Sequence, residues 1–224
     1  MRPEYLRLAR DFERLVADFG GRLEGAVLED VATLMSAIEC IDRSVDVLRD
    51  RCDRDRLGAD VLRALRDGSS PPEWAEELRA RTAELRAVLV RRDVVAPFLA
   101  IAQDALSNAE QLRDCRTHDE YVARVVAEGR MTTELALTVA GDAGGDEFAR
   151  FFVSLGEPAN LVDKLRDARG DAARGEILLT PGPRLHLRLA SEILRRLPGL
   201  LRLHPRPVSL LVWGAGYLLS SQSD

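Results

Sequence analysis

Apolar residues recur at spacings of three and four along nearly the whole chain, which is the period of one face of an α-helix. The strict alternation of apolar and polar residues that is typical of strands is almost absent. The pattern therefore predicts an all-α protein, in which about eight to ten helices pack as a bundle. The expected helices span residues 3–19, 22–51, 58–67, 71–91, 94–114, 118–128, 131–144, 146–169, 184–196 and 207–219.

Glycine, serine and proline residues predict where these helices begin and end. Gly20-Gly21 is expected to end the first helix, and Ser70 to cap the helix that starts at Pro71-Pro72. Gly129 is expected to separate the helices on either side of it. No connection is a Pro/Gly/Ser-rich linker long enough to divide the chain, so residues 1–224 are expected to form a single domain.

The composition narrows the choice of function. The chain of 224 residues is 46% hydrophobic and carries a formal net charge of −5, which does not favour nucleic-acid binding. No apolar run reaches the roughly 18 residues of a membrane helix. The C-terminal stretch VSLLVWGAGYLL is therefore interpreted as a core helix, with peripheral contact to a membrane surface as the alternative. Cys40, Cys52 and Cys115 have no metal-site spacing and are expected to be free thiols, as in a cytoplasmic protein.

Two rows of aspartates stand at intervals of four residues. The first row, Asp42, Asp46 and Asp50, lies in one predicted helix, and the second, Asp163, Asp167 and Asp171, runs from another predicted helix into the connection after it. In a helix this spacing places the members of a row near one face, where like charges repel by a few tenths of a kcal/mol per pair. For either row taken alone, a solvated face paired with arginines explains the spacing.

Two rows on two helices indicate more specific chemistry. Carboxylates that face each other across a cavity are unfavourable unless a positive charge lies between them. Mg²⁺ prefers oxygen ligands, keeps several waters and is usually completed by substrate phosphates. Several Mg²⁺ ions between the rows would hold a diphosphate and neutralise its charge as it departs. The carbocation left behind calls for a central apolar cavity from which water is excluded.

The surroundings of these rows resemble the squalene/phytoene synthase family. The segment LGEPANLVDKLRDARGDAARG at 155–175 is similar to the family's second aspartate-rich segment, which reads as a glycine, Gln-x-x-Asn, Leu-Arg-Asp, a further Asp and Arg-Gly. IDRSVD at 41–46 resembles its first D-x-x-x-D, and TVAGDAGG at 138–145 resembles its Val-Ala-Gly segment. The three matches come in the family's order and cover roughly residues 30–176. In this match Asn160 takes the glutamine position and Asp163 the asparagine position.

The resemblance implies an isoprenoid synthase-like fold and a Mg²⁺-dependent enzyme that ionises farnesyl or geranylgeranyl diphosphate. It implies head-to-head coupling of two prenyl diphosphates; the alternatives are a divergent terpene cyclase, prenyl transfer to another acceptor, or a non-catalytic isoprenoid-binding relative. The implied metal ligands are Asp42, Asp46, Asp163 and Asp167, supported by Asp171, and the implied substrate-binding residues are Asn160, Arg166, Arg174 and Gly141.

The chain departs from the family at two places. The Tyr-Cys pair that usually precedes Val-Ala-Gly is replaced by residues around Leu135 to Leu137, and the usual Arg-x-Tyr-Leu-Pro after Arg-Gly is replaced by a stretch that begins at Glu176. The chain is also shorter than family members at its C-terminal end. These departures keep the metal and diphosphate residues and leave open the coupling step and any NADPH-dependent reduction.

Overall fold

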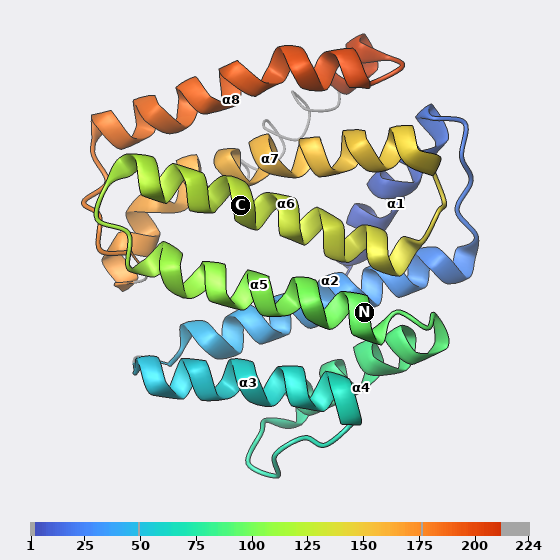
Figure 1. The fold of residues 1–224 in the computed structure, drawn as a ribbon, viewed down its shortest axis with the longest axis vertical. Coiled ribbons are helices and arrows are strands. Elements are labelled where there is room, and N and C mark those ends of the chain that lie inside the picture. The colour runs from blue at the N-terminus through green and yellow to red at the C-terminus, as the bar shows by residue number, and fades with distance from the viewer. Residues whose placement is uncertain (1–2, 49, 176, 212–224) are drawn as a thin grey trace.

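The chain folds into a bundle of helices (Figure 1). The computed structural model describes residues 3–48, 50–175 and 177–211, with side chains from residue 10 onward. Its labelled helices are α1 (Pro3–Asp18), α2 (Gly25–Asp46), α3 (Arg51–Asp67), α4 (Glu76–Arg91), α5 (Val95–Arg113), α6 (His118–Ala140), α7 (Gly145–Arg174) and α8 (Pro183–Leu203). Residues 207–211 are helical too, and the rest of the helix expected at 207–219 lies outside the described residues. Within the described ranges there is no strand, which confirms the all-α prediction.

The long helix expected at 22–51 is in fact two helices. α2 ends at Asp46 and α3 begins at Arg51, because Asp50 caps the second helix. The Asp50 carboxylate accepts hydrogen bonds from the backbone N–H groups of Cys52 at 2.7 Å and of Asp53 at 3.4 Å. A side chain that satisfies N–H groups in this way favours the start of a new helix over continuation of the old one. Asp50 therefore has a structural role that separates it from the aspartate row.

Gly129 does not separate two helices, contrary to the prediction. α6 runs through it without a break, and Gly129 lies where α6 crosses α7. A Cβ atom at Gly129 would stand 2.2 Å from the carbonyl oxygen of Gly156, and a Cβ atom at Gly156 would stand 2.3 Å from the carbonyl oxygen of Gly129. Glycine is required at both positions because the two backbones touch there.

Other boundaries also differ from expectation, and α8, for example, continues through Pro198 to Leu203 instead of ending at residue 196. Ser70 is not an N-cap, since α4 begins at Glu76 and its N-cap, Ala75, makes no side-chain capping bond. α7 continues past the expected residue 169 to Arg174, where Gly175 ends it in the left-handed conformation at φ 77°. Asp171 therefore lies on α7 and not in the connection that follows.

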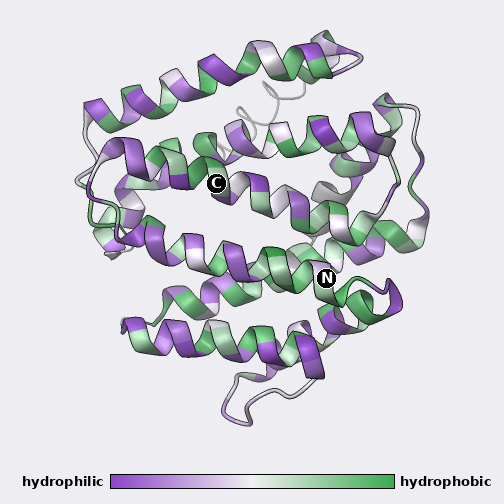
Figure 2. Ribbon diagram, viewed as in Figure 1, coloured by the Kyte–Doolittle hydropathy of each residue, from purple (hydrophilic) through white to green (hydrophobic). Residues whose placement is uncertain are grey.

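The buried side chains form two main hydrophobic clusters. The larger joins α1–α5 to the adjoining parts of α6 and α7, and Phe12, Leu34, Leu89 and Phe148 are among its members. The smaller lies between α6, α7 and α8, around Leu161, Leu185 and Leu189. Every labelled helix accordingly carries both hydrophobic and hydrophilic residues along its length (Figure 2). All three cysteines are free.

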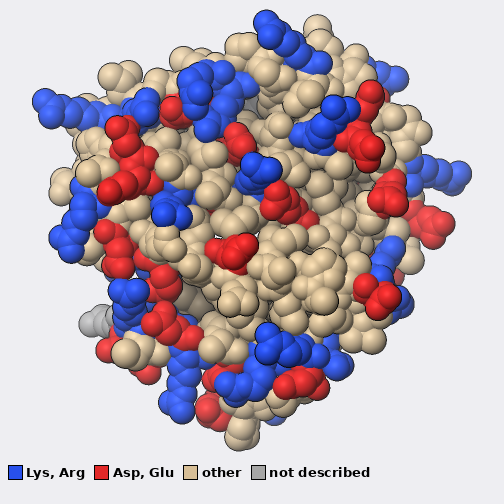
Figure 3. All heavy atoms as spheres, viewed as in Figure 1, with Lys and Arg blue, Asp and Glu red and all other residues tan. Residues whose placement is uncertain are grey.

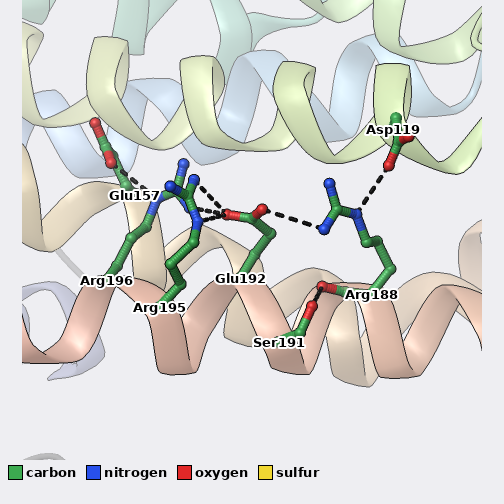
Figure 4. Close-up of polar contacts among 7 residues, drawn as sticks. All are labelled: Asp119, Glu157, Arg188, Ser191, Glu192, Arg195 and Arg196. Carbon is green, nitrogen blue, oxygen red and sulfur yellow. Dashed lines mark hydrogen bonds and ion pairs between the residues drawn. The ribbon is translucent and has the colours of Figure 1, made fainter.

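A polar network ties α8 to its neighbours (Figure 4). The buried Glu192 accepts hydrogen bonds from Arg195, at 2.8 Å, and from Arg196. Arg196 also donates to Glu157 of α7 at 3.0 Å, and Arg188 donates to Asp119 of α6 at 2.8 Å. Charge-assisted bonds of this kind fix the orientation of α8 over the smaller cluster.

Candidate functional site

A cavity of about 400 Å³ lies between α2, α3, α5, α6 and α7. It lies where the two hydrophobic clusters meet, because Ile41 and Leu62 pack against the larger cluster while Leu112 and Ile177 belong to the smaller one. Val45 and Leu106 extend its apolar wall. The charged residues that line it are Asp42, Asp46, Arg54, Asp55, Glu110, Arg113, Glu128, Lys164 and Asp171. The combination of an apolar wall and converging charges is typical of a ligand site.

Both aspartates of the first predicted pair line this cavity. Burial by the surrounding helices, together with the negative charges of Asp46 and Glu128, raises the pKa of Asp42 to about 7. The Asp42 side chain is nevertheless exposed, so water in the cavity reaches it. Asp46 lies 3.5 Å from the guanidinium of Arg113, which comes from the end of α5.

The second row reaches the cavity with only one of its aspartates. Successive residues of an α-helix are rotated by about 100°, so members of a row four apart drift by about 40° at each step. Asp171 shares a face of α7 with Lys164, seven residues before it, and both line the cavity. Asp163 points about 90° away from that face. Asp163 and Asp167 are not among the residues that line the cavity, and Asp167 is exposed.

Asp171 is buried and already has two cationic partners. Its carboxylate accepts hydrogen bonds from the ammonium of Lys164 at 3.4 Å and from Arg174 at 2.7 Å. Burial by itself would lower the pKa of Lys164, but the charges of Glu128 and Asp171 outweigh this and raise the pKa to about 12. Lys164 is therefore a fixed positive charge on the cavity wall.

The other residues implied by the resemblance lie around the cavity or outside it. The Asn160 amide donates hydrogen bonds to the Val125 carbonyl at 2.7 Å and to the Glu128 carboxylate at 2.8 Å, so it orients a cavity residue. Gly141 caps the C-terminus of α6 at φ 67°, away from the residues that line the cavity. Arg166 is exposed on α7.

Burial and the neighbouring Asp167 also raise the pKa of Asp163, which is half-buried. Among its weaker influences are Lys164, which lowers this pKa, and Glu128, which raises it. Asp163 therefore lies near the same charged residues as Asp42, although it does not line the cavity.

Sequence reasoning missed six charged residues of the cavity, namely Arg54, Asp55, Glu110, Arg113, Glu128 and Lys164. Lys164 is the only lysine in the chain and stands seven residues before Asp171, and that spacing was a signal that the two share a helix face. Arg113 and Glu128 had no comparable signal, because they come from the end of α5 and the middle of α6 and are brought to the cavity only by the fold.

The aspartates of α2 fit a Mg²⁺ site better than the aspartates of α7 do. Asp42 and Asp46 offer carboxylates toward the open space of the cavity, and Mg²⁺ prefers carboxylate oxygens completed by water and substrate phosphate. On α7, Asp171 is paired with Lys164 and Arg174, and Asp163 does not line the cavity. Across the described ranges, no group of three or more His, Cys, Asp or Glu side chains is already arranged around one metal position.

The cavity can therefore attract cations through Asp42 and Asp46 and accept an apolar group beside residues such as Val45 and Leu106. Its cationic side chains, Arg54, Arg113 and Lys164, lie among the carboxylates and not apart from them. We compared the chain with family models, curated proteins and solved structures, and none of them matches it.

Proposed function

We propose that the protein binds a prenyl diphosphate in this cavity together with Mg²⁺ and ionises its allylic C–O bond, as an isoprenoid synthase-like enzyme. The observation that carries the proposal is that Asp42 and Asp46 open into a cavity whose lining also includes apolar residues such as Val45, Leu62 and Leu106. The motif resemblance to squalene/phytoene synthases supports the same chemistry and the same fold.

The charge of the cavity supports a requirement for metal ions. Among the described residues, six carboxylates and three cationic side chains line it. A prenyl diphosphate brings roughly three more negative charges at neutral pH. Such a ligand would be repelled unless cations entered with it, and Mg²⁺ is the cation that carboxylates and phosphates share.

Different residues of the cavity would hold the metal, add positive charge and enclose the prenyl chain. Asp42 and Asp46 would hold the metal, which supplies Lewis-acid neutralisation of the departing diphosphate. Arg113 and Lys164 offer fixed positive charges close to the same carboxylates. The apolar residues, such as Val45 and Leu106, would enclose the prenyl chain and keep water from the cation that forms.

The volume favours one prenyl chain over two. About 400 Å³ lies near the lower end of the range of roughly 300–1,000 Å³ that small-molecule sites occupy. Head-to-head coupling would have to hold two prenyl diphosphates at once. Cyclisation, or transfer to a smaller acceptor, therefore fits the cavity better than squalene- or phytoene-type coupling.

A second candidate is isoprenoid binding without turnover. The observation that favours it is the pairing of Asp171 with Lys164 and Arg174, which leaves the α7 wall neutralised without metal. A binding protein would hold the apolar chain in the cavity and would not need the first pair of aspartates for affinity.

Diphosphate release and ligand affinity separate the two candidates. We would incubate the protein with farnesyl and geranylgeranyl diphosphate, with and without Mg²⁺, and measure released diphosphate and prenyl products by mass spectrometry. The enzyme proposal expects Mg²⁺-dependent release that the Asp42→Asn/Asp46→Asn double variant loses. Asp104→Asn, an exposed change on α5 outside the cavity lining, serves as the matched control and should keep the activity. Tight binding without release, unchanged in the double variant, would instead establish the binding protein.

A further inference from the structure

The outer face of α8 carries exposed leucines that belong to neither hydrophobic cluster. Leu187 is 72% exposed and Leu194 is 66% exposed. They stand seven residues apart and therefore on the same side of the helix. The buried Leu185 and Leu189 already supply the contacts of α8 with the smaller cluster, and the buried Leu200 packs in the larger one. The two outer leucines thus form a second apolar strip that faces away from the core.

A row of arginines runs beside this strip. Its members, Arg184, Arg188, Arg195 and Arg202, are all exposed and fall within an arc of about 40° along the length of α8. Blue side chains accordingly gather along the upper edge of the molecule, where α8 lies (Figures 1 and 3). Arg188 and Arg195 also bind Glu192, but 44% and 68% of their side chains remain exposed.

This region differs in charge from the rest of the chain. Residues 183–211 contain six arginines and a single acidic residue, Glu192, whereas the whole chain has a net charge of −5. The single acid is buried against the arginines of its own helix. The outer face of α8 is therefore positive and apolar at once, on a protein that is otherwise acidic.

We propose that this face of α8 docks on the surface of an anionic lipid bilayer. Leucines beside a row of arginines on one exposed helix form the pattern of helices that lie in the interface of a membrane, with the apolar side chains below the headgroups and the arginines among them. The row and the strip extend along the whole of a long helix at the edge of the bundle, which suits a flat partner better than a small acidic protein (Figure 1). This proposal is independent of the chemistry in the cavity, because no residue of α8 lines it.

Vesicle co-sedimentation tests the proposal directly. The full chain would be mixed with vesicles of phosphatidylcholine alone and with vesicles that contain about one third phosphatidylglycerol, at about 0.1 M and about 0.5 M salt. We expect binding to the anionic vesicles only, with clear loss at the higher salt. The Leu187→Ser/Leu194→Ser variant should bind at least about tenfold more weakly because it removes buried apolar area. Arg184→Gln/Arg202→Gln should lose about fivefold per arginine.

A matched variant on another surface controls for general effects. Val90 of α4 is 51% exposed and Arg66 of α3 is exposed, and Val90→Ser/Arg66→Gln makes the same kinds of change away from α8. It should bind like the wild type, and circular dichroism should show that all three double variants are folded. The proposal is overturned by wild-type protein that stays in solution with anionic vesicles, by equal binding to neutral vesicles, or by α8 variants that bind as well as the control. A wild-type dimer that the leucine variant dissociates, without any vesicle binding, would assign the strip to a second copy of the chain instead.

Discussion

Replacing Asp42 with asparagine tests the electrostatics of the cavity through the stability of the fold. The folded protein raises the pKa of Asp42 to about 7 from an ordinary value of 3.8. The folded state therefore holds the proton of this carboxyl more tightly than the unfolded chain does. It follows that Asp42 lowers the free energy of unfolding as the pH rises from 3.8 to about 7, and that the cost is complete above that range.

The loss in free energy of unfolding that ionised Asp42 causes has an upper limit, which water in the cavity reduces. A difference of about three pH units at 1.36 kcal/mol each would give about 4 kcal/mol. The Asp42 side chain is exposed to the cavity, where water screens its charge, so we expect a cost of only about 1–2 kcal/mol. Asparagine has nearly the same shape and no charge. Asp42→Asn should therefore be more stable than the wild type by about 1–2 kcal/mol above pH 7 and about equally stable near pH 4.

Urea unfolding at about pH 4.5 and about pH 8, followed by far-UV circular dichroism, measures the difference. Asp104→Asn should change little at either pH, since Asp104 is exposed outside the cavity lining. Mg²⁺ should stabilise the wild type more than Asp42→Asn at the higher pH, because it binds the folded protein through this carboxylate. A variant that is less stable than the wild type at pH 8, or an advantage that does not grow with pH, would refute the reasoning.

Three further predictions concern the framework. Gly129→Ala should lower the free energy of unfolding by about 3 kcal/mol in urea titrations, because its Cβ would meet the Gly156 carbonyl oxygen; Gly199→Ala, whose Cβ would meet nothing within 4 Å, should instead be neutral or stabilising. Asp50→Ala should cost about 1 kcal/mol by the same titration, since two N–H groups of α3 lose their acceptor, and an unchanged midpoint would contradict the capping role. Burial would raise the pKa of Glu192, but hydrogen bonds from its arginines outweigh this and lower it, so Glu192→Gln should cost about 1–2 kcal/mol near neutral pH. Stability–pH curves should show that this cost shrinks as the pH falls below about 4, and a cost that is constant with pH would count against the ionic role.

The periodicity of apolar residues was enough to predict the fold class and most helices, because burial of one helix face leaves a repeat in the sequence. The predicted helix boundaries were wrong where a local interaction outweighed the helical period of apolar residues. Asp50 ended one helix pattern and started another by accepting two backbone hydrogen bonds, while Gly129 looked like a break and proved to be a contact between backbones.

The candidate site was predictable in part for a similar reason. Asp42 and Asp46 line the cavity together with Ile41 and Val45, their apolar neighbours on the same helix. The second row was assigned as a unit, although a spacing of four drifts around a helix and a spacing of seven nearly returns to the same side. Lys164 and Asp171 share that side and reach the cavity, whereas Asp163 does not line it. Partners such as Arg113 come from a distant part of the chain, and local spacing carries no information about them.

The contact between Gly129 and Gly156 limits how the aspartate helix can respond to a ligand. Where two backbones touch, one helix can neither approach the other nor slide along it without a clash, but it can still turn or tilt about the point of contact. Asp163 lies about two turns beyond this point on α7. A ligand that drew Asp163 toward the cavity would therefore have to turn α7 about this contact, and the turn would also move Lys164 from its present position.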